Sequence, residues 1–400
     1  GRHLSTLDTL TGAVLYTFGY DSAGRLITIT DGDGNVTTVQ RDGKGNPTAI
    51  IASGGQRTTL AVDANGWLAR VTNPAGETTQ LSSTSGGLLQ TFTDARNGVS
   101  RYTYNALGLL IRAEDPAGGV KTLSRIDSSS GYTATLTTAL GRTRTYQVLY
   151  LSTGAVRRIN SDEHGARTKV LSNPDGTQVV TYPSGVIVTT TFGPDPRFGM
   201  QAPRVVQRVR KTPGGPTETI TTTRDVLLYD SNDLLSLETL TDTATINGRT
   251  FTRVYTAGNR TFTDTSAEGR RRLTQLDTQG RVIHQETIAT PALEPRTFTY
   301  DTRGQLTEAR QGSQFWTFHY DAGNRLIERR DTAGQTVTFG YDANDRLTEQ
   351  TFPSGVTYQF GYDANGNPTQ VILPSDAVHA FSYTPVNLTA AYTPPDTIYG

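Results

Sequence analysis

Apolar and polar residues alternate with a period of two in the most regular stretches of this 400-residue sequence. Such alternation predicts β-strands and does not fit the 3.6-residue period of a helix. The clearest runs of alternating apolar residues are Trp316, Phe318 and Tyr320, and Val356, Tyr358, Phe360 and Tyr362.

Short turn sequences separate these strands. In Asn73–Gly76, Asp115–Gly118 and Asn173–Gly176, an Asn or Asp comes first, Pro second and Gly last. This is the chemistry of a type I β-turn, because Pro fixes φ at the second position and the Asn or Asp side chain caps the turn. The expected unit is a pair of antiparallel strands with two turns.

The unit repeats every 21 residues at both ends of the chain, which is the signature of a repeat architecture. The late copies are Tyr300-Asp301, Tyr320-Asp321, Tyr341-Asp342 and Tyr362-Asp363, with Tyr383 in the same register, and the early copies are Tyr20-Asp21, Arg41-Asp42, Val62-Asp63, Ser83-Thr84 and Tyr104-Asn105. We expect the Tyr and Asp residues, and the glycines that follow them, to define the repeat structurally. These glycines are Gly24, Gly304 and Gly366.

The period is irregular in the middle of the chain. There, Arg204–Lys211 and Thr217–Arg224 flank a Pro- and Gly-rich turn and predict one long hairpin. No shift in composition marks a separate domain, so we expect one continuous array. It is divided into regular repeats over 1–125, irregular repeats over 126–255 with a loop excursion near 193–217, and regular repeats over 256–400.

The repeat count predicts an unusually long sheet. About 19 units supply about 38 strands, and at ~4.8 Å per strand these make a ribbon near 180 Å long. Open twisted sheets rarely exceed about ten strands without curling. We therefore expect an all-β fold in which an antiparallel ribbon coils into a spiral, a solenoid or a partial hollow shell.

The residues of the unit carry a family resemblance. Tyr20 to Leu26 read Tyr-Asp-Ser-Ala-Gly-Arg-Leu, and Tyr341 to Leu347 repeat the pattern with Asp345 in place of Gly. The sequence has six Tyr-Asp dipeptides, and the unit resembles the YD repeat of bacterial Rhs proteins, Tc toxin B and C components, wall-associated bacterial proteins and animal teneurins. The resemblance implies a β-ribbon that spirals into a hollow shell, which in toxin members encloses a C-terminal toxic polypeptide.

Toxin members of that family end the shell with a self-cleaving aspartate element that contains Asp-Pro-x-Gly-Leu. The most similar string, Asp115–Gly119, lacks the Leu and occupies an ordinary turn of the repeat, and Asp195-Pro196 matches less well. We therefore interpret the sequence as a fragment of a longer chain that stops before the cleavage element and the toxin.

Charge and composition exclude several classes of function. The 37 basic and 37 acidic residues cancel, so no net field attracts nucleic acid or an anionic membrane. The sequence contains no Cys, which excludes disulfides, thiolate metal sites and a cysteine nucleophile. No stretch approaches the roughly 18 apolar residues of a membrane span. We expect neither a nucleic-acid partner nor a membrane span.

Two acidic clusters resemble functional sites. Asp31, Asp33, Asn35 and Asp42 mimic the ligand spacing of a calcium loop, but Val36 stands where a sharp turn needs Gly. An Asx-rich hairpin turn is the favoured interpretation.

The second cluster is Asp162, Glu163 and His164, which precede Gly165 and fit a solvated turn better than an acid–base pair. The five histidines are too scattered for a metal motif, so we expect no catalytic residue, cofactor or metal. The five histidines are His3, His164, His284, His319 and His379.

The repeated Tyr and Asp allow two interpretations. As structural residues, the tyrosines would stack across neighbouring strands and the aspartates would cap the turns that follow. As a binding site, the tyrosines would form a platform for sugar rings. The structural interpretation is favoured, because the motif recurs throughout the chain and a binding site is normally local.

Two functions from different classes remain. The first is a structural shell of a secreted or cell-surface bacterial protein that encloses a toxin or effector polypeptide, supplied by the C-terminal part of the same longer chain. The second is a surface protein that binds glycans or other cells through its repeats. An enzyme is not favoured, because nothing in the sequence assembles a nucleophile, a base and an oxyanion donor.

Overall fold

The computed structural model describes residues 1–288 and 293–395. These residues form 35 β-strands and one short 3₁₀ helix, η1 (Ala257–Asn259), compared with the roughly 38 strands expected. None of the helical structure in this described part is long and apolar enough to cross a membrane.

The chain divides into two compact units. Unit 1 comprises Gly1–Leu7, Ala13–Val120 and Arg296–Gly400, and unit 2 comprises Asp8–Gly12 and Lys121–Pro295.

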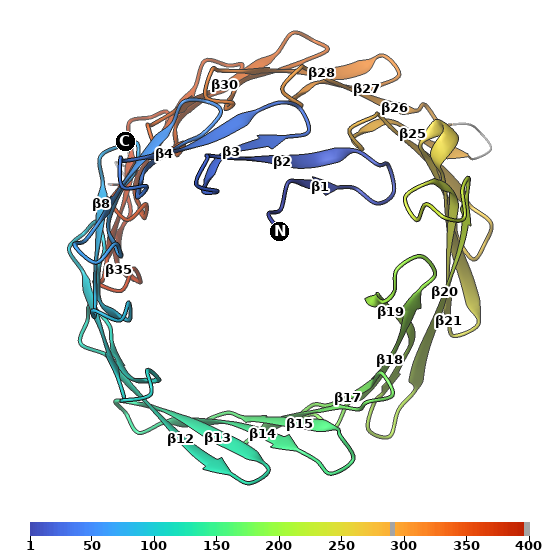
Figure 1. Cartoon of the computed structure of the whole chain (residues 1–400). Helices are drawn as coiled ribbons and strands as arrows, with labels where there is room; N and C mark the ends of the chain where they lie inside the picture. The colour runs from blue at the N-terminus through green and yellow to red at the C-terminus, as the bar shows by residue number, and fades with distance from the viewer. Residues whose placement is uncertain (289–292, 396–400) are drawn as a thin grey trace. The chain divides into compact units, whose positions relative to one another are not determined.

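The strands of unit 1 come from both ends of the chain (Figure 1). They are β1 (Ser5–Leu7), β2 (Val14–Tyr20), β3 (Leu26–Asp31), β4 (Val36–Arg41), β5 (Pro47–Ile51), β6 (Arg57–Val62), β7 (Leu68–Thr72), β8 (Thr78–Ser83), β9 (Leu89–Thr93), β10 (Val99–Tyr104) and β11 (Leu110–Glu114), followed by β26 (Arg296–Tyr300), β27 (Leu306–Gln311), β28 (Gln314–Tyr320), β29 (Leu326–Asp331), β30 (Thr336–Tyr341), β31 (Leu347–Thr351), β32 (Thr357–Tyr362), β33 (Pro368–Ile372), β34 (Val378–Tyr383) and β35 (Thr389–Thr393).

The longest strands of unit 2 lie near its middle. Apart from Val120, which belongs to unit 1, the unit contains β12 (Val120–Ser128), β13 (Gly131–Thr138), β14 (Thr143–Tyr150), β15 (Val156–Ser161), β16 (Arg167–Ser172), β17 (Thr177–Thr181), β18 (Ile187–Asp195), β19 (Gly199–Lys211), β20 (Thr217–Leu228), β21 (Leu237–Ile246), β22 (Arg249–Thr256), β23 (Thr261–Thr265), β24 (Arg271–Leu276) and β25 (Val282–Ile288).

Strands that follow one another within a unit pair antiparallel, which confirms the predicted hairpin ribbon. The register shifts by one residue at the motif tyrosines, for example between Gly19 and Tyr20, between Gly340 and Tyr341, and between Gly361 and Tyr362. A β-bulge of this kind adds local twist to a strand. In unit 1, the repeat therefore places the same twist-inducing irregularity at the end of every second strand.

The turns close with the geometry that the sequence predicts. In the turn after Tyr20, the Gly24 amide donates to the Asp21 carbonyl at 2.9 Å, and Gly24 has φ of 83°. A positive φ favours Gly because a Cβ is crowded there. Asn324 and Asp345 take the same place in later turns with φ of 68° and 62°, which short Asx side chains tolerate.

The irregular middle contains paired strands where a loop excursion was expected. Strands β18 and β19 pair antiparallel, from Ile187 opposite Lys211 to Asp195 opposite Gly199. The register shifts after Thr191 and again after Gly193. The bulges absorb the sequence irregularity without breaking the hydrogen-bonded ladder. The predicted hairpin is present as β19 and β20, joined where Lys211 faces Thr217.

Few side chains are buried. In the described ranges, the buried apolar residues are Ala49, Ala155, Val188, Leu237, Leu240, Tyr255, Leu276 and Val337. The one cluster among them lies in unit 2, around the fully buried ring of Tyr255, and Leu10 from the segment Asp8–Gly12 packs against it. Nη1 of Arg197 donates to the Thr9 carbonyl at 2.8 Å and holds the same segment. The sheet is otherwise a single layer.

Within unit 1, the two ends of the chain meet along a seam. The N-terminal tier, residues 13–120, and the C-terminal tier, residues 296–395, lie side by side as blue and red strands in Figure 1. Contacts between turns of the two tiers join residues that are about 269 positions apart in the sequence. The Ala75 amide donates to Oδ1 of Asn344 at 3.1 Å, and Nε2 of Gln56 donates to the Gly323 carbonyl at 2.8 Å.

Each tier has two rims. The YD rim consists of the turns that follow the motif tyrosines, and the second rim consists of the turns at the other strand ends. The seam joins the second rim of the N-terminal tier to the YD rim of the C-terminal tier. Its strongest contacts are at Glu77, which accepts from Nδ2 of Asn344 at 2.7 Å and from Nη2 of Arg346 at 3.1 Å, and at Arg96, whose Nε lies 3.3 Å from Oδ2 of Asp363.

The seam predicts a specific crosslink in this Cys-free chain. Nδ2 of Asn324 lies 2.9 Å from Oγ of Ser53, so the double variant Ser53→Cys and Asn324→Cys should be joined by a short bis-maleimide. The measurement is the mobility shift on a denaturing gel after the 271-residue loop is closed. The matched control, Ser53→Cys with Asn365→Cys, is displaced by two repeats and should stay unlinked. Equal crosslinking of both pairs would show that the register of the seam is not fixed.

Candidate functional site

The motif aspartates cap their own turns. Oδ1 of Asp342 accepts the backbone amides of Asn344 at 2.8 Å and Arg346 at 3.0 Å. Burial opposes the ionisation of Asp342, but the hydrogen bonds from the side chain and backbone of Arg346 outweigh it, and the pKa of Asp342 is lowered. The ionised carboxylate therefore stabilises the turn that it closes.

The motif arginines connect one turn to the next. Nε of Arg346 donates to Oδ2 of Asp342 at 2.6 Å, and its Nη1 donates to the Asp363 carbonyl of the following turn at 3.0 Å. Its guanidinium also lies 5.1 Å from the ring centre of Tyr362, which is cation–π distance. Arg325 makes the same set of contacts one repeat earlier.

The motif tyrosines reach back to the preceding repeat. The hydroxyl of Tyr341 donates to the Leu326 carbonyl at 2.8 Å, and that of Tyr362 donates to the Leu347 carbonyl at 2.8 Å. Burial raises the pKa of both phenols. Because consecutive motif tyrosines lie two strands apart, the ring of Tyr362 stacks on Arg346 in place of the tyrosine-on-tyrosine stacking that we expected.

Other predicted repeat residues occupy the equivalent places in their own turns. Tyr20 donates to the His3 carbonyl, Tyr104 to the Leu89 carbonyl and Tyr320 to the Leu306 carbonyl. The remaining aspartates cap their turns through backbone amides, and the glycines take positive φ. These residues are Asp21, Asp301, Asp321, Asp363, Gly24, Gly304 and Gly366, with Tyr300 at the strand end before Asp301.

The calcium-like spacing does not form one loop. Asp31 and Asp42 cap separate turns at opposite ends of β4. Oδ1 of Asp31 accepts the amides of Asp33 and Asn35 at 3.0 and 2.8 Å, as in an Asx turn. Across the described residues, no group of three or more His, Asp or Glu side chains is placed to hold a metal.

The acidic cluster before Gly165 also caps a turn. Oδ1 of Asp162 accepts the amides of His164 and Ala166 at 2.9 Å each. Oε2 of Glu163 accepts from Nε of Arg144 at 2.8 Å, and this hydrogen bond is the main cause that lowers the pKa of Glu163 to about 2. A carboxylate this acidic is a poor general base near neutral pH.

In both strings that resemble the cleavage element, Asp115–Gly119 and Asp195-Pro196, the aspartate makes structural contacts. Oδ1 of Asp115 accepts the amides of Ala117 and Gly119 and caps an ordinary turn. Asp195 is buried, with its side chain 4% exposed, and its Oδ2 accepts from Nη1 of Arg224 at 3.0 Å.

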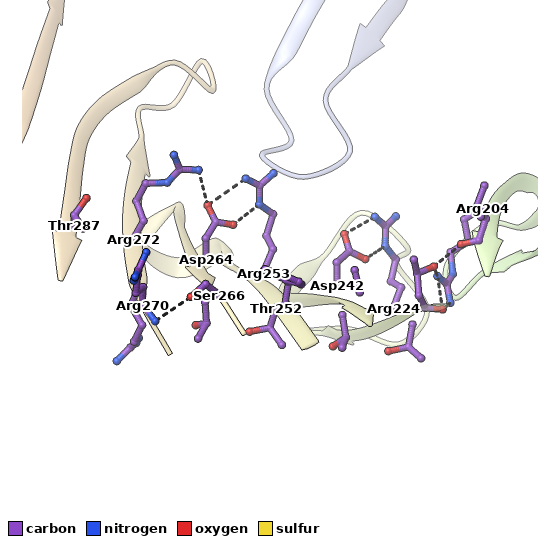
Figure 2. Close-up of a pocket in the computed structure, with 18 residues that line it drawn as sticks. Arg204, Arg224, Asp242, Thr252, Arg253, Asp264, Ser266, Arg270, Arg272 and Thr287 are labelled. Atoms are coloured by element: carbon purple, nitrogen blue, oxygen red, sulfur yellow. Dashed lines mark hydrogen bonds and ion pairs between the residues drawn. The ribbon is translucent and has the colours of Figure 1, made fainter. Parts of the chain in front are cut away.

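A row of alternating charges crosses unit 2 (Figure 2). Its members face one another across neighbouring strands, so they share one face of the sheet. In order from β20 to β24 they are Arg224, Asp242, Arg253, Asp264 and Arg272. Arg224 donates two hydrogen bonds to Asp242, both of 2.7 Å. Arg253 donates two to Asp264, of 2.6 and 3.2 Å. Arg272 shares Asp264 at 2.9 Å.

This charged row lines a groove of about 740 Å³, with Arg204, Ala244 and Phe251 among the other lining residues. The hydrogen bond from Arg253 is the main cause that lowers the pKa of Asp264, with a further contribution from Arg272. Sequence analysis missed this row because its members come from five different strands, β20 to β24; the run Arg270–Arg272 was the one local signal. The charges of the row satisfy one another.

Comparison with known proteins identifies the family. The family model described as teneurin YD-shell matches residues 1–397, nearly the whole chain. The chain belongs to the teneurin YD-shell family. A search of curated proteins found no match.

Solved structures resemble this YD-shell chain in fold. The Tc holotoxin pore of Photorhabdus luminescens with a mutated TccC3 aligns with a TM-score of 0.55 and 12% identity, over 96% of this chain and 23% of that chain. The structure of TcdB2-TccC3-TEV aligns with a TM-score of 0.52 and 13% identity, over 96% and 23%. This YD-shell chain thus spans about a quarter of the length of those proteins.

The tyrosine links predict a measurable loss of stability. Tyr341→Phe removes the hydroxyl that satisfies the Leu326 carbonyl and should lower the free energy of unfolding of unit 1 by about 1 kcal/mol. Chemical denaturation followed by hydrogen exchange of β28–β31 measures this change. Tyr358→Phe, at a tyrosine of unit 1 outside the motif, is the control and should change little. Equal effects of the two changes would contradict the role given to the motif tyrosine.

The charged row predicts an asymmetry between two arginines. Arg224→Leu leaves the buried Asp195 without its ion-pair partner and should destabilise unit 2 by about 3 kcal/mol. Arg253→Leu should cost about 1 kcal/mol or less, because Asp264 keeps Arg272 and Arg253 is half exposed. Urea denaturation of both variants tests this order, and the reverse order would contradict it.

Proposed function

We propose that this YD-shell chain forms part of a wall that encloses a polypeptide cargo. The observation that carries the proposal is the seam, in which turns of two tiers interlock edge to edge at a spacing of about 269 residues. A single-layer sheet whose edges are joined by side-chain hydrogen bonds is a continuous barrier, and a barrier is what confinement requires.

The sparse burial supports the same function. Apart from the Tyr255 cluster, the ribbon has no second layer packed on either face, so both faces of its strands are available to contact other molecules. The charged row of unit 2 pairs its own charges and offers no catalytic group. The function that we propose on this basis is exclusion and confinement.

The cargo is a toxin or effector polypeptide from the C-terminal part of the same longer chain, in a secreted or cell-surface bacterial protein. Family membership and the likeness to Tc toxin structures support this assignment. Glycan binding through the motif tyrosines is not proposed, because the rings and hydroxyls of Tyr341 and Tyr362 are already engaged by Arg325, Arg346 and backbone carbonyls.

Limited proteolysis of the natural full-length protein tests confinement. The cargo should resist protease for as long as the wall stays closed. Arg96→Glu should open the seam, because it replaces the ion pair with Asp363 by repulsion, and should expose the cargo to cleavage many times faster. The control Arg101→Glu, at a side chain that is 59% exposed and whose acidic neighbour Glu114 lies 4.0 Å away, should leave the protection unchanged. Cargo that is cleaved at the same rate in all three proteins would refute confinement.

A further inference from the structure

The groove that the charged row lines carries more positive charge than its carboxylates can neutralise. Six arginines and two aspartates are among its 18 lining residues. A third carboxylate, that of Asp195, pairs with Arg224 at 3.0 Å without lining the groove. Six guanidinium groups therefore meet three carboxylates, and an excess of three positive charges remains. Because the whole chain has no net charge, this excess is a local feature.

Three of these arginines have no carboxylate partner among the residues that the structure describes. They are Arg204, Arg270 and Arg271. Nη1 of Arg204 donates to the neutral hydroxyl of Thr222 at 3.1 Å. The hydrogen bond from Arg270 to Ser266 comes from the backbone amide. A guanidinium group is always charged and has five N–H donors, so these side chains keep donors for an anionic partner.

Donors remain at both ends of the groove. Figure 2 shows Arg204 at one end of the row and Arg270 and Arg272 at the other. Arg272 uses one donor, its Nη2, on Asp264 at 2.9 Å. Asp264 also accepts two hydrogen bonds from Arg253, so it does not depend on Arg272 alone. Each end thus presents guanidinium donors that the row does not use.

The centre of the groove is close to neutral. There, Asp242 and Asp264 are already paired with arginines of the row. Ala244 and Phe251 face each other across β21 and β22 and add apolar surface. A partner should therefore be uncharged in its middle, where it also meets hydroxyl groups. These hydroxyls belong to Thr222, Thr223, Thr243, Thr252, Thr265 and Thr287.

The length of the groove sets the length of the partner. Arg204 lies on β19 and Arg272 on β24, five strand spacings apart, which is ~24 Å at ~4.8 Å per spacing. An extended peptide rises ~3.3 Å per residue and covers this distance in about seven residues. A nucleic acid carries a phosphate on every nucleotide and would place negative charge over Asp242 and Asp264. The groove therefore favours a peptide that is acidic at both ends.

We propose that this groove binds an extended acidic segment of a polypeptide. Arg204 holds a carboxylate at one end, and Arg270 and Arg272 hold a carboxylate at the other, about seven residues away. Guanidinium groups match carboxylates with paired, charge-assisted hydrogen bonds. Between the two ends, the threonine hydroxyls bond to the peptide backbone. Binding does not require that a cargo be confined, so the inference stands apart from the proposed function.

Fluorescence anisotropy with the purified chain tests this proposal. The probe is a rhodamine-labelled peptide, Glu-Glu-Ser-Gly-Ser-Gly-Ser-Glu-Glu, whose acidic pairs are seven residues apart. It should bind saturably, and more weakly as ionic strength rises. The same peptide with Gln in place of every Glu should not bind. The shorter peptide Glu-Glu-Ser-Glu-Glu should bind several-fold more weakly, because it cannot reach both ends.

A charge reversal at one end tests the site itself. Arg270→Glu should weaken binding of the longer peptide about tenfold or more, because it removes a charge-assisted hydrogen bond and adds repulsion. The bond to Ser266 comes from the backbone and is kept, and circular dichroism checks the strand content. The matched control is Arg158→Glu, at an exposed arginine of β15 that does not line the groove, and it should bind like the wild type.

Several results would overturn the proposal. They are a wild type that binds no acidic peptide, equal binding of the Glu and Gln peptides, and equal loss of binding in the Arg270→Glu and Arg158→Glu chains. An oligothymidylate of nine nucleotides that binds as tightly as the acidic peptide would assign the groove to nucleic acid and overturn the proposal as well.

Discussion

Backbone pairing between consecutive strands is the interaction on which the rest of this structure depends. A single-layer sheet cannot bury enough apolar surface to hold itself together, and only a handful of the described side chains are fully buried. Each strand is instead fixed by the ladder to the strand before it and the strand after it. Stability in such a chain is a sum of neighbouring contacts, as in other repeat proteins.

The YD motif adds a second set of links along one rim of this ladder. Tyr341 bonds back to the preceding repeat, Asp342 closes its own turn, and Arg346 bonds forward to the following turn. These three residues tie consecutive repeats together where the strands end and the ladder is weakest. The links account for the recurrence of the motif without a local binding site.

Much of the local fold could be predicted from the sequence, because Tyr, Asp and Gly recur at fixed places and each has a local cause. The hairpin over 204–224 follows from the turn chemistry of Pro213–Pro216. The contacts at Glu77 and Arg96 could not be predicted, because they join residues far apart in the sequence and depend on twist accumulated over many strands. The row from Arg224 to Arg272 was missed for a similar reason, because its members face one another only once five strands have paired.

The interlocking of the two tiers is the central claim, and hydrogen exchange tests it most directly. In a Glu77→Lys variant, the repulsion between the introduced ammonium group and the guanidinium of Arg346 should accelerate amide exchange in the turns 342–346 and 363–367, the nearer of which lies about 269 residues away in the sequence. Turns of the C-terminal tier that do not meet the seam, such as 352–356, should exchange as before. Faster exchange confined to the residues around position 77 would contradict the interlocked tiers.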